Sequence, residues 1–310
     1  MFGFTFHYFE NEVHIPCQGS LTADQFRRLL DALQQEYRII TPQAFLGHLK
    51  NGTGEEEDIC LCFDCGLKSQ YDVALPILEE RGLRAFWFLY TSVFQGKIVP
   101  IEQYHHFRFS CFPAVLDFYR AFFTVLKQRE PDKFAQGMED FHRSSYLSWA
   151  VFYTEEDRQF KFFRDRVLQT WEYDALLTEM MAQAGYNVEY HRHNLWLTAA
   201  EVRQLSDNGH IIGMHTHSHP NEIAALSYEE QQIEYETNQR ILQAICDKPV
   251  TCMSHPCNSY NADTLRILEA LGVEAGFRAD SNAAYSSRLE IPRIDHSQWI
   301  HAHKELKIWQ

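Results

Sequence analysis

Short apolar runs that alternate with amphipathic segments constrain the fold of this chain more than any other feature. Ile59–Phe63 is one such run, and it fits a buried parallel strand. Further runs at Ala85–Tyr90 and Ile211–Met214 follow segments with helical spacing. Strands that alternate with helices in this way predict an α/β fold with a parallel sheet that closes into a barrel.

The alternation is interrupted in the middle of the chain. The stretch 95–194 has no clear strand–helix rhythm, is crowded with aromatic residues and carries helix signals such as the capping pair Thr154 and Asp157. We therefore expect two barrel segments, 1–94 and 195–310, on either side of a helical, aromatic-rich insertion. The insertion is expected to form packed core. A lid over a substrate and a contact with another copy of the chain in a homo-oligomer are the alternatives.

Charge and cysteine usage exclude several classes of protein. The chain has 28 Lys and Arg against 42 Asp and Glu, a net charge of −14, which disfavours nucleic acid and anionic membranes as partners. No stretch approaches the roughly 20 apolar residues of a membrane span. Met1–Pro16 lacks the features of a signal peptide, and the eight scattered cysteines do not resemble a secreted disulfide framework. We therefore expect a cytoplasmic location.

Two of the expected strand ends carry groups that bind metals. Asp64 and Cys65 follow the expected strand Ile59–Phe63, and His215 and His219 follow the expected strand Ile211–Met214. Because active sites of parallel barrels lie at the carboxyl ends of the strands, these groups are expected to meet. Two imidazoles with a thiolate or carboxylate make a three-ligand zinc site with one open position. The alternatives are histidines bonded to backbone, a cysteine that fills the core and an aspartate that caps a turn.

These motifs resemble those of the NodB-type polysaccharide deacetylases (carbohydrate esterase family 4). Asp64-Cys65-Gly66 stands where the family has Thr-Phe-Asp-Asp-Gly, and His215–His219 looks like its His-x-x-x-His motif. Residues 254–261 resemble its third motif, and the start Phe6-His7-Tyr8 matches its usual lead-in. The resemblance covers roughly 1–94 and 195–295 and omits the insertion. It implies a distorted (β/α) barrel of the deacetylase type.

The resemblance also implies a role for each matched residue. Asp64 matches the general base, and His215 and His219 match the two metal-binding histidines. Cys65 occupies the position of the third ligand, an aspartate in the family, so that zinc is favoured and other divalent metals are alternatives. The expected substrate-binding residues are His255, Pro256, Cys257, Tyr260 and Arg293. The alternative for His255 and Cys257 is a role as additional metal ligands or proton carriers.

The family motif that supplies a general-acid histidine is not recognisable in this chain. His296 is the candidate by its position near the C-terminus. The other histidines that remain open for this role are His301 and His303, together with His105, His106, His191 and His193 in the insertion.

Together these features predict a metal-dependent hydrolase that removes an acetyl or similar acyl group from an N-acylated amino sugar or glycan precursor. The alternative is a catalytically degenerate protein of this fold that binds a glycan or a protein partner, and Cys65 and the missing motif motivate it. A third, weaker alternative is hydrolysis of a C–N bond outside a sugar.

Overall fold

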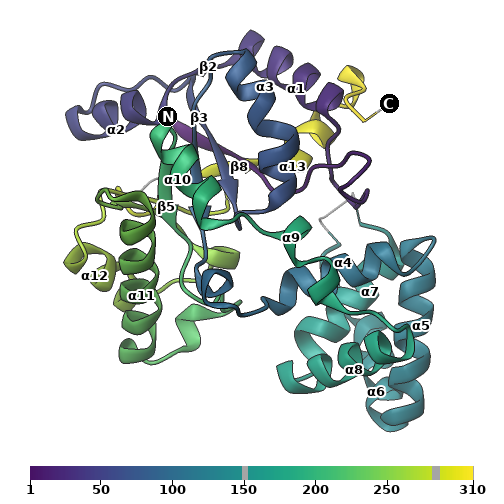
Figure 1. The fold of residues 1–310 in the computed structure, drawn as a ribbon. Coiled ribbons are helices and arrows are strands. Elements are labelled where there is room, and N and C mark those ends of the chain that lie inside the picture. Colours follow the sequence, from purple (N-terminus) through teal and green to yellow (C-terminus); the bar gives the residue numbers. More distant parts are fainter. Residues whose placement is uncertain (149–152, 281–286, 310) are drawn as a thin grey trace. The chain divides into compact units, whose positions relative to one another are not determined.

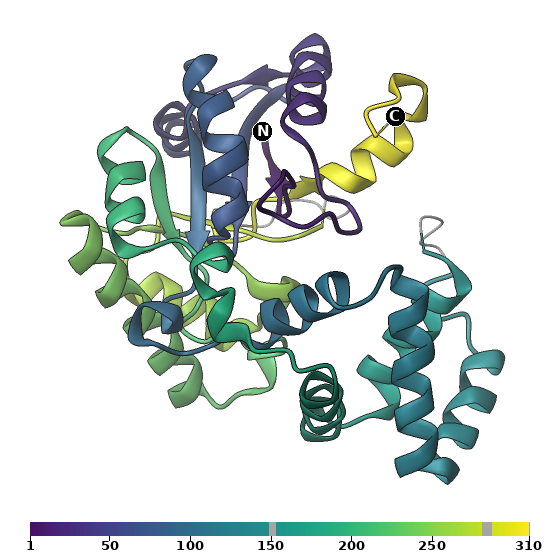
Figure 2. The ribbon, with the colours of Figure 1, turned by 45° about the vertical axis from the view of Figure 1, so that its right-hand side comes forward.

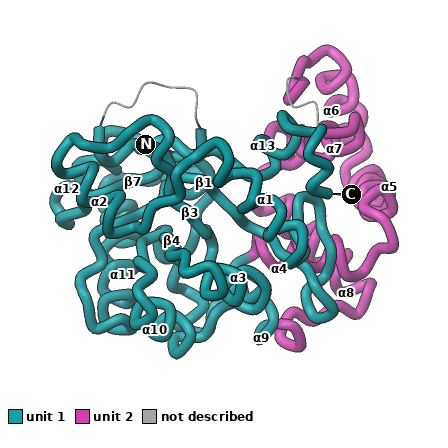
Figure 3. The backbone as a smooth tube through the Cα atoms, turned by 90° about the horizontal axis from the view of Figure 1, so that it is seen from above, with its two compact units in different colours: residues 1–99, 192–310 teal, residues 100–191 magenta. Residues whose placement is uncertain are grey.

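The computed structural model describes residues 1–148, 153–280 and 287–309. The chain divides into two compact units (Figure 3). The first unit comprises Met1–Val99 and Arg192–Gln310, and the second comprises Pro100–His191. The boundaries expected from the sequence were 94/95 and 194/195.

A sheet of eight parallel strands forms the centre of the first unit (Figures 1 and 2). The strands are β1 (Phe2–Phe6), β2 (Arg38–Ile39), β3 (Asp58–Asp64), β4 (Ala85–Leu89), β5 (Ile211–Met214), β6 (Cys252–Ser254), β7 (Ala275–Phe277) and β8 (Arg293–Asp295). Their order is β7-β6-β5-β4-β3-β1-β8, and β2 pairs with β3 beside this path. A parallel bridge between Phe277 and Ile291 brings β7 next to the segment before β8, so the barrel is nearly closed. The predicted distorted (β/α) barrel is therefore confirmed.

Helices surround this sheet, and capping residues mark where several of them begin. They are α1 (Ala23–Glu36), α2 (Pro42–Asn51), α3 (Leu75–Glu80), α9 (Arg192–Leu195), α10 (Ala199–Asp207), α11 (Tyr228–Cys246), α12 (Ala262–Ala270) and α13 (His296–Ala302). Capping boxes at Thr22, Thr198 and Ser227 satisfy backbone N–H groups in the first turns of α1, α10 and α11. Such caps fix where each helix begins.

Strand β3 is buried at all seven of its positions. Because side chains alternate along a strand, Leu61 and Phe63 face one apolar cluster while Cys60 and Cys62 face another. The two cysteines pack there with Phe86 and other aromatic side chains. Burial on both faces explains the continuous apolar run that identified this strand in the sequence.

The second unit is helical and has a core of its own. Its main helices are α4 (Pro100–Ser110), α5 (Val115–Arg129), α6 (Pro131–Arg143), α7 (Glu155–Phe162) and α8 (Thr170–Gln183). The buried cluster between them is mainly aromatic and includes Phe107, Phe118, Tyr119, Phe122, Phe141, Phe160 and Phe163. The aromatic residues that crowd this stretch of sequence are thus packed core.

No single helix in the described ranges has the length and hydropathy needed to cross a membrane, and only α4 and α5 meet that standard jointly, as a pair bent by 113°.

Gly276 in β7 marks a close approach of two backbone segments. A Cβ at this position would lie 2.6 Å from the carbonyl oxygen of Leu289 and 2.9 Å from its Cα. We expect Gly276→Ala to lower the free energy of unfolding by about 1–3 kcal/mol, because backbone must shift to admit the methyl group. The control is Gly47→Ala in α2, where the added Cβ meets nothing within 4 Å and a gain of about 0.5–1 kcal/mol is expected. Equal urea midpoints for the two variants would contradict this prediction.

Candidate metal centre and active site

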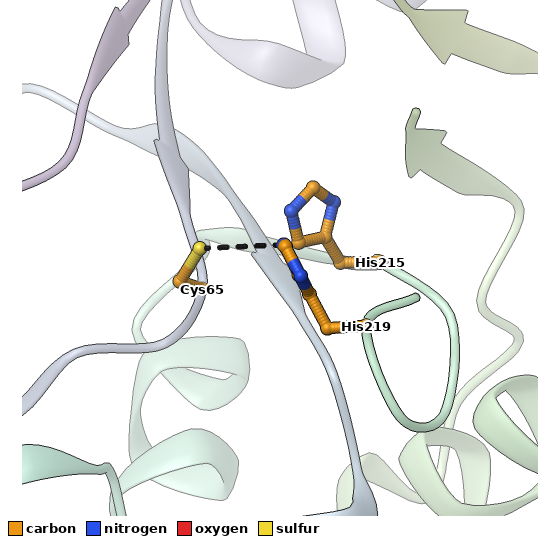
Figure 4. Close-up of side chains that lie close together, drawn as sticks. All are labelled: Cys65, His215 and His219. Atoms are coloured by element: carbon orange, nitrogen blue, oxygen red, sulfur yellow. Dashed lines mark hydrogen bonds between the residues drawn. The ribbon is translucent and has the colours of Figure 1, made fainter. Parts of the chain in front are cut away.

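Two strand ends of the barrel bring three metal-binding side chains together. Cys65 directly follows β3, His215 directly follows β5, and His219 lies four residues further on. One ligand atom from each residue lies within 4.8 Å of the other two, and all three residues are buried. Figure 4 shows the side chains gathered in one place, with Sγ of Cys65 3.9 Å from Nε2 of His219.

The backbone at this cluster adopts conformations that side chains disfavour. Cys65 has a φ of 74°, Thr216 a φ of 62° and His219 a φ of 58°, all in the left-handed region. Each such residue costs on the order of 1–3 kcal/mol, and this strain concentrates at functional sites. The ligand residues are therefore held by their surroundings in positions that local preference would not choose.

The histidine rings are set in the form that binds a metal. Nδ1 of His215 donates to the carbonyl of Ser254 at 3.0 Å, which leaves Nε2 as the ring nitrogen with a lone pair. Burial lowers the pKa of His215 to about 3 and that of His219 to about 4, so both rings are neutral at neutral pH. Nδ1 of His219 is buried and has no hydrogen-bond partner among the described residues. One thiol and two neutral imidazoles fit the ligand set of zinc.

Asp64 ends β3 next to Cys65 and is held by Arg293 of β8. Nη1 and Nη2 of Arg293 lie 2.7 and 2.8 Å from Oδ1 and Oδ2 of Asp64, and the Ser254 hydroxyl donates to Oδ2 at 3.1 Å. Burial raises the pKa of Asp64, but the charge and the hydrogen bonds of Arg293 hold it well below its ordinary value. The carboxylate is therefore ionised and fixed in orientation.

His7 is a functional candidate that the sequence analysis did not single out. It is the first residue after β1, with Nε2 3.9 Å from Oδ2 of Asp64 and Nδ1 3.7 Å from Oδ2 of Asp295. Burial lowers the pKa of His7, but Asp295 and Asp64 together raise it by more than burial lowers it. The pKa of His7 therefore lies above its ordinary value. The side chain is 34% exposed and can exchange a proton with solvent or a ligand. Its position at a strand end was the signal that could have identified it.

Gln70 connects the two strand ends that carry His7 and Asp64. Its fully buried side chain donates from Nε2 to the carbonyl of His7 at 2.8 Å and to that of Asp64 at 2.7 Å. Its Oε1 accepts from the backbone N–H of Leu67 at 3.3 Å. No sequence pattern identifies Gln70 as a functional residue, because its hydrogen-bond partners are main-chain groups.

His296 does not present a ring nitrogen to this cluster. Its Nδ1 lies 3.3 Å from the carbonyl oxygen of Thr5, and its Nε2 lies 2.8 Å from that of Gly19. The ring is buried and stacks on Phe6. This geometry favours a structural role for His296 over the proton-donor role expected from its position in the sequence.

The expected substrate-binding residues differ in how much of each side chain a substrate could reach. Cys257 is exposed, whereas Pro256 and His255 are buried, and Nε2 of His255 donates to the carbonyl of Leu289 at 2.8 Å. His255 stacks on Tyr260, which is partly buried, with ring centroids 4.2 Å apart. The guanidinium of Arg293 is committed to Asp64, so this residue acts within the site and does not line an open groove.

Comparison with known proteins finds a likeness in a part of the chain that carries some of these features. The polysaccharide deacetylase family model matches residues 167–276, which contain the His215–His219 motif. This part of the chain is similar to the polysaccharide deacetylases. The Bacillus subtilis protein YxkH, by name a candidate polysaccharide deacetylase, is 28% identical over 94 residues. That stretch covers 30% of this chain and 33% of YxkH, so the likeness spans about a third of either protein.

Solved structures are similar in fold to this chain over nearly its whole length. IcaB from Ammonifex degensii has a TM-score of 0.56 at 11% identity, with 99% of this chain and 96% of IcaB covered. The Streptococcus pyogenes deacetylase PplD, in complex with acetate, has a TM-score of 0.55 at 14% identity, with 94% and 90% covered. A de-N-acetylase from Aggregatibacter actinomycetemcomitans has a TM-score of 0.55 at 13% identity, with 98% of both chains covered. At these identities the likeness establishes a shared fold.

Proposed function

We propose that this chain is a zinc-dependent hydrolase that removes an acetyl or similar acyl group from an N-acylated amino sugar or glycan precursor. The convergence of Cys65, His215 and His219 beside an ionised Asp64 carries the proposal. The family match and the names of the relatives support a carbohydrate substrate. We also propose a cytoplasmic location, since none of the eight cysteines, all in described parts of the chain, is disulfide-bonded.

In the proposed reaction, water replaces the amine at the acyl carbon. When bound by Cys65, His215 and His219, zinc supplies Lewis-acid chemistry that acidifies water and polarises a carbonyl. Asp64 accepts the proton that water loses as its oxygen bonds to the acyl carbon. His7, whose pKa is raised, donates a proton to the amine nitrogen as the C–N bond breaks. The products are a carboxylate and a free amino sugar.

Arg293 and Gln70 orient the groups that move protons. Arg293 fixes both oxygens of Asp64, and Gln70 fixes the backbone on which Asp64 and His7 lie. Such preorganisation reduces the reorganisation that the reaction needs. We therefore assign a positioning role to Arg293 in place of substrate contact.

The proposal is tested by acyl release from N-acetylated amino-sugar oligomers with zinc-loaded protein. We expect His7→Gln to lower kcat on the order of 100-fold, because Gln cannot deliver a proton, while the zinc content stays at the wild-type level. His215→Ala is expected to lose both zinc and acyl release. His142→Gln, at an exposed position in α6, is the matched control.

Two results would go against this assignment. Full activity of His7→Gln would remove His7 from the reaction. Zinc-loaded wild type that binds the oligomers and releases no acyl group, across sugars and other amides, would favour the degenerate binding protein. The engagement of both Asp64 oxygens by Arg293 is the observation that keeps this alternative in view.

A further inference from the structure

The loop that carries His215 and His219 is held from outside by helix α11. Its φ values at Thr216 and His219 are left-handed, so the loop does not keep its shape by local preference. Two polar residues one helical turn apart on α11, Glu234 and Asn238, make contacts that help to impose this shape.

Glu234 binds the centre of the loop between the two histidines. One of its oxygens, Oε2, accepts from the backbone N–H of His217 at 2.8 Å and from that of Ser218 at 2.7 Å. The other oxygen, Oε1, accepts from the hydroxyl of Ser218 at 2.7 Å. Hydrogen bonds to an ionised carboxylate are roughly twice as strong as neutral ones. The side chain of Glu234 therefore holds the backbone of the loop strongly at His217 and Ser218.

Asn238 binds the start of the same loop. Its Oδ1 accepts from the backbone N–H of His215 at 3.1 Å. Its Nδ2 donates to the carbonyl of Leu89 at 3.0 Å and to the hydroxyl of Thr91 at 3.1 Å. The side chain is fully buried, and it ties the ligand strand β5 to the end of its neighbour β4.

The far side of the loop is held by the segment after β4. The backbone N–H groups of Thr91 and Ser92 donate to the carbonyl of His217 at 3.1 and 2.9 Å. Within the loop, the hydroxyl of Thr216 accepts from the backbone N–H of His219 at 3.2 Å. The backbone between the two imidazoles is therefore fixed from both sides, and Glu234 supplies the charged part of that support.

We infer that Glu234 and Asn238 are positioning residues that set the zinc affinity of the Cys65–His215–His219 centre. This inference rests on the metal site of the proposed function and extends it to α11, which supplies no ligand. Outer partners that orient metal ligands typically contribute about 10–100-fold to metal affinity. Without the carboxylate, two backbone N–H groups lose their acceptor, and the loop relaxes away from the geometry that brings both rings to one ion.

The test measures zinc affinity by competition with a chromophoric chelator, on the full chain freed of metal. We expect Glu234→Ala to weaken zinc binding by about 10-fold or more, and Glu234→Gln, which keeps one acceptor oxygen, to fall between it and wild type. Glu236→Gln is the matched control, because Glu236 lies on the same helix, is exposed and contacts Gln232. The absorption spectrum of the cobalt-substituted protein is expected to change in the Glu234 variants alone.

A second measurement separates positioning from general stabilisation. A residue that only stabilises the fold lowers the melting temperature with and without zinc equally, so the zinc-induced increase is unchanged. We expect this increase to shrink in both Glu234 variants. Zinc affinities within twofold of wild type in both variants would overturn the inference and leave the metal site in place. A wild-type protein that binds no zinc would overturn the proposed function and this inference together.

Discussion

Replacing Arg293 by methionine is expected to lower the free energy of unfolding by about 3–5 kcal/mol, because it leaves the carboxylate of Asp64 buried without its partner. The side chain of Arg293 is 2% exposed, and its guanidinium contacts both oxygens of Asp64 at 2.7 and 2.8 Å. An isolated charge at such depth loses its hydration and gains little in return. Urea unfolding of the metal-free protein measures this loss.

The double variant Asp64→Asn/Arg293→Met tests whether the lost stability comes from the unpaired charge of Asp64, because it removes both charges of the pair. With both charges removed, we expect much of the lost stability to return, since buried ion pairs are often nearly neutral relative to uncharged replacements. The two single variants should therefore not be additive. Additivity within about 0.5 kcal/mol would show that the two side chains do not depend on each other. Acyl release is expected to stay absent in the double variant, because a side-chain amide in place of the Asp64 carboxylate cannot act as a base.

The pH dependence of stability provides a second readout of the same pair. The pKa of Asp64 is lower in the folded protein than its unfolded value of about 3.9. Its contribution is therefore fully present above that value and is lost as the pH falls below it. The double variant, which has no carboxylate at position 64, is expected to lose less stability on acidification below about pH 4 than wild type does.

The fold of this chain was largely predictable because its local signals agree with one another. The run Ile59–Phe63 is apolar because β3 is buried on both faces, and Thr22, Thr198 and Ser227 begin helices because their hydroxyls accept backbone N–H groups. The meeting of Cys65 with His215 followed from the rule that parallel strands place their carboxyl ends at one edge. These inferences need only the order of the elements.

The rest of the site depends on tertiary contacts that leave no pattern in the sequence. Arg293 lies 229 residues from Asp64, and nothing local distinguishes a buried pair from a substrate contact. Gln70 and Glu234 bind main-chain groups, which every residue offers. His296 was chosen by its position near the C-terminus, but the direction of its ring is set by the carbonyls of Thr5 and Gly19.

Cys65 stands where the deacetylases that this chain resembles have an aspartate, and its role is open to a direct test. We expect Cys65→Ala to weaken zinc binding by about 100-fold or more, because one of three ligands is lost. The thiol is 6% exposed, and Sγ lies 3.9 Å from Nε2 of His219. If the thiol were only apolar filler, alanine would change core packing and leave the zinc affinity nearly intact.

Cys65→Asp is expected to keep a three-ligand site and to change its metal preference. A carboxylate is a harder ligand than a thiolate, so the ratio of zinc to manganese affinity should fall by about 10-fold or more. The exchange is compatible with the backbone, since Asp tolerates the left-handed φ of 74° at this position better than most residues.

The matched control for this exchange is Cys257→Asp, whose position is exposed and also left-handed, with a φ of 51°. Chelator competition with Zn²⁺ and Mn²⁺ measures both affinities, and the thiolate-to-metal absorption of the cobalt-substituted protein should disappear in Cys65→Asp alone. An unchanged zinc-to-manganese ratio would mean that Cys65 does not bind the metal. The site would then rest on the two imidazoles.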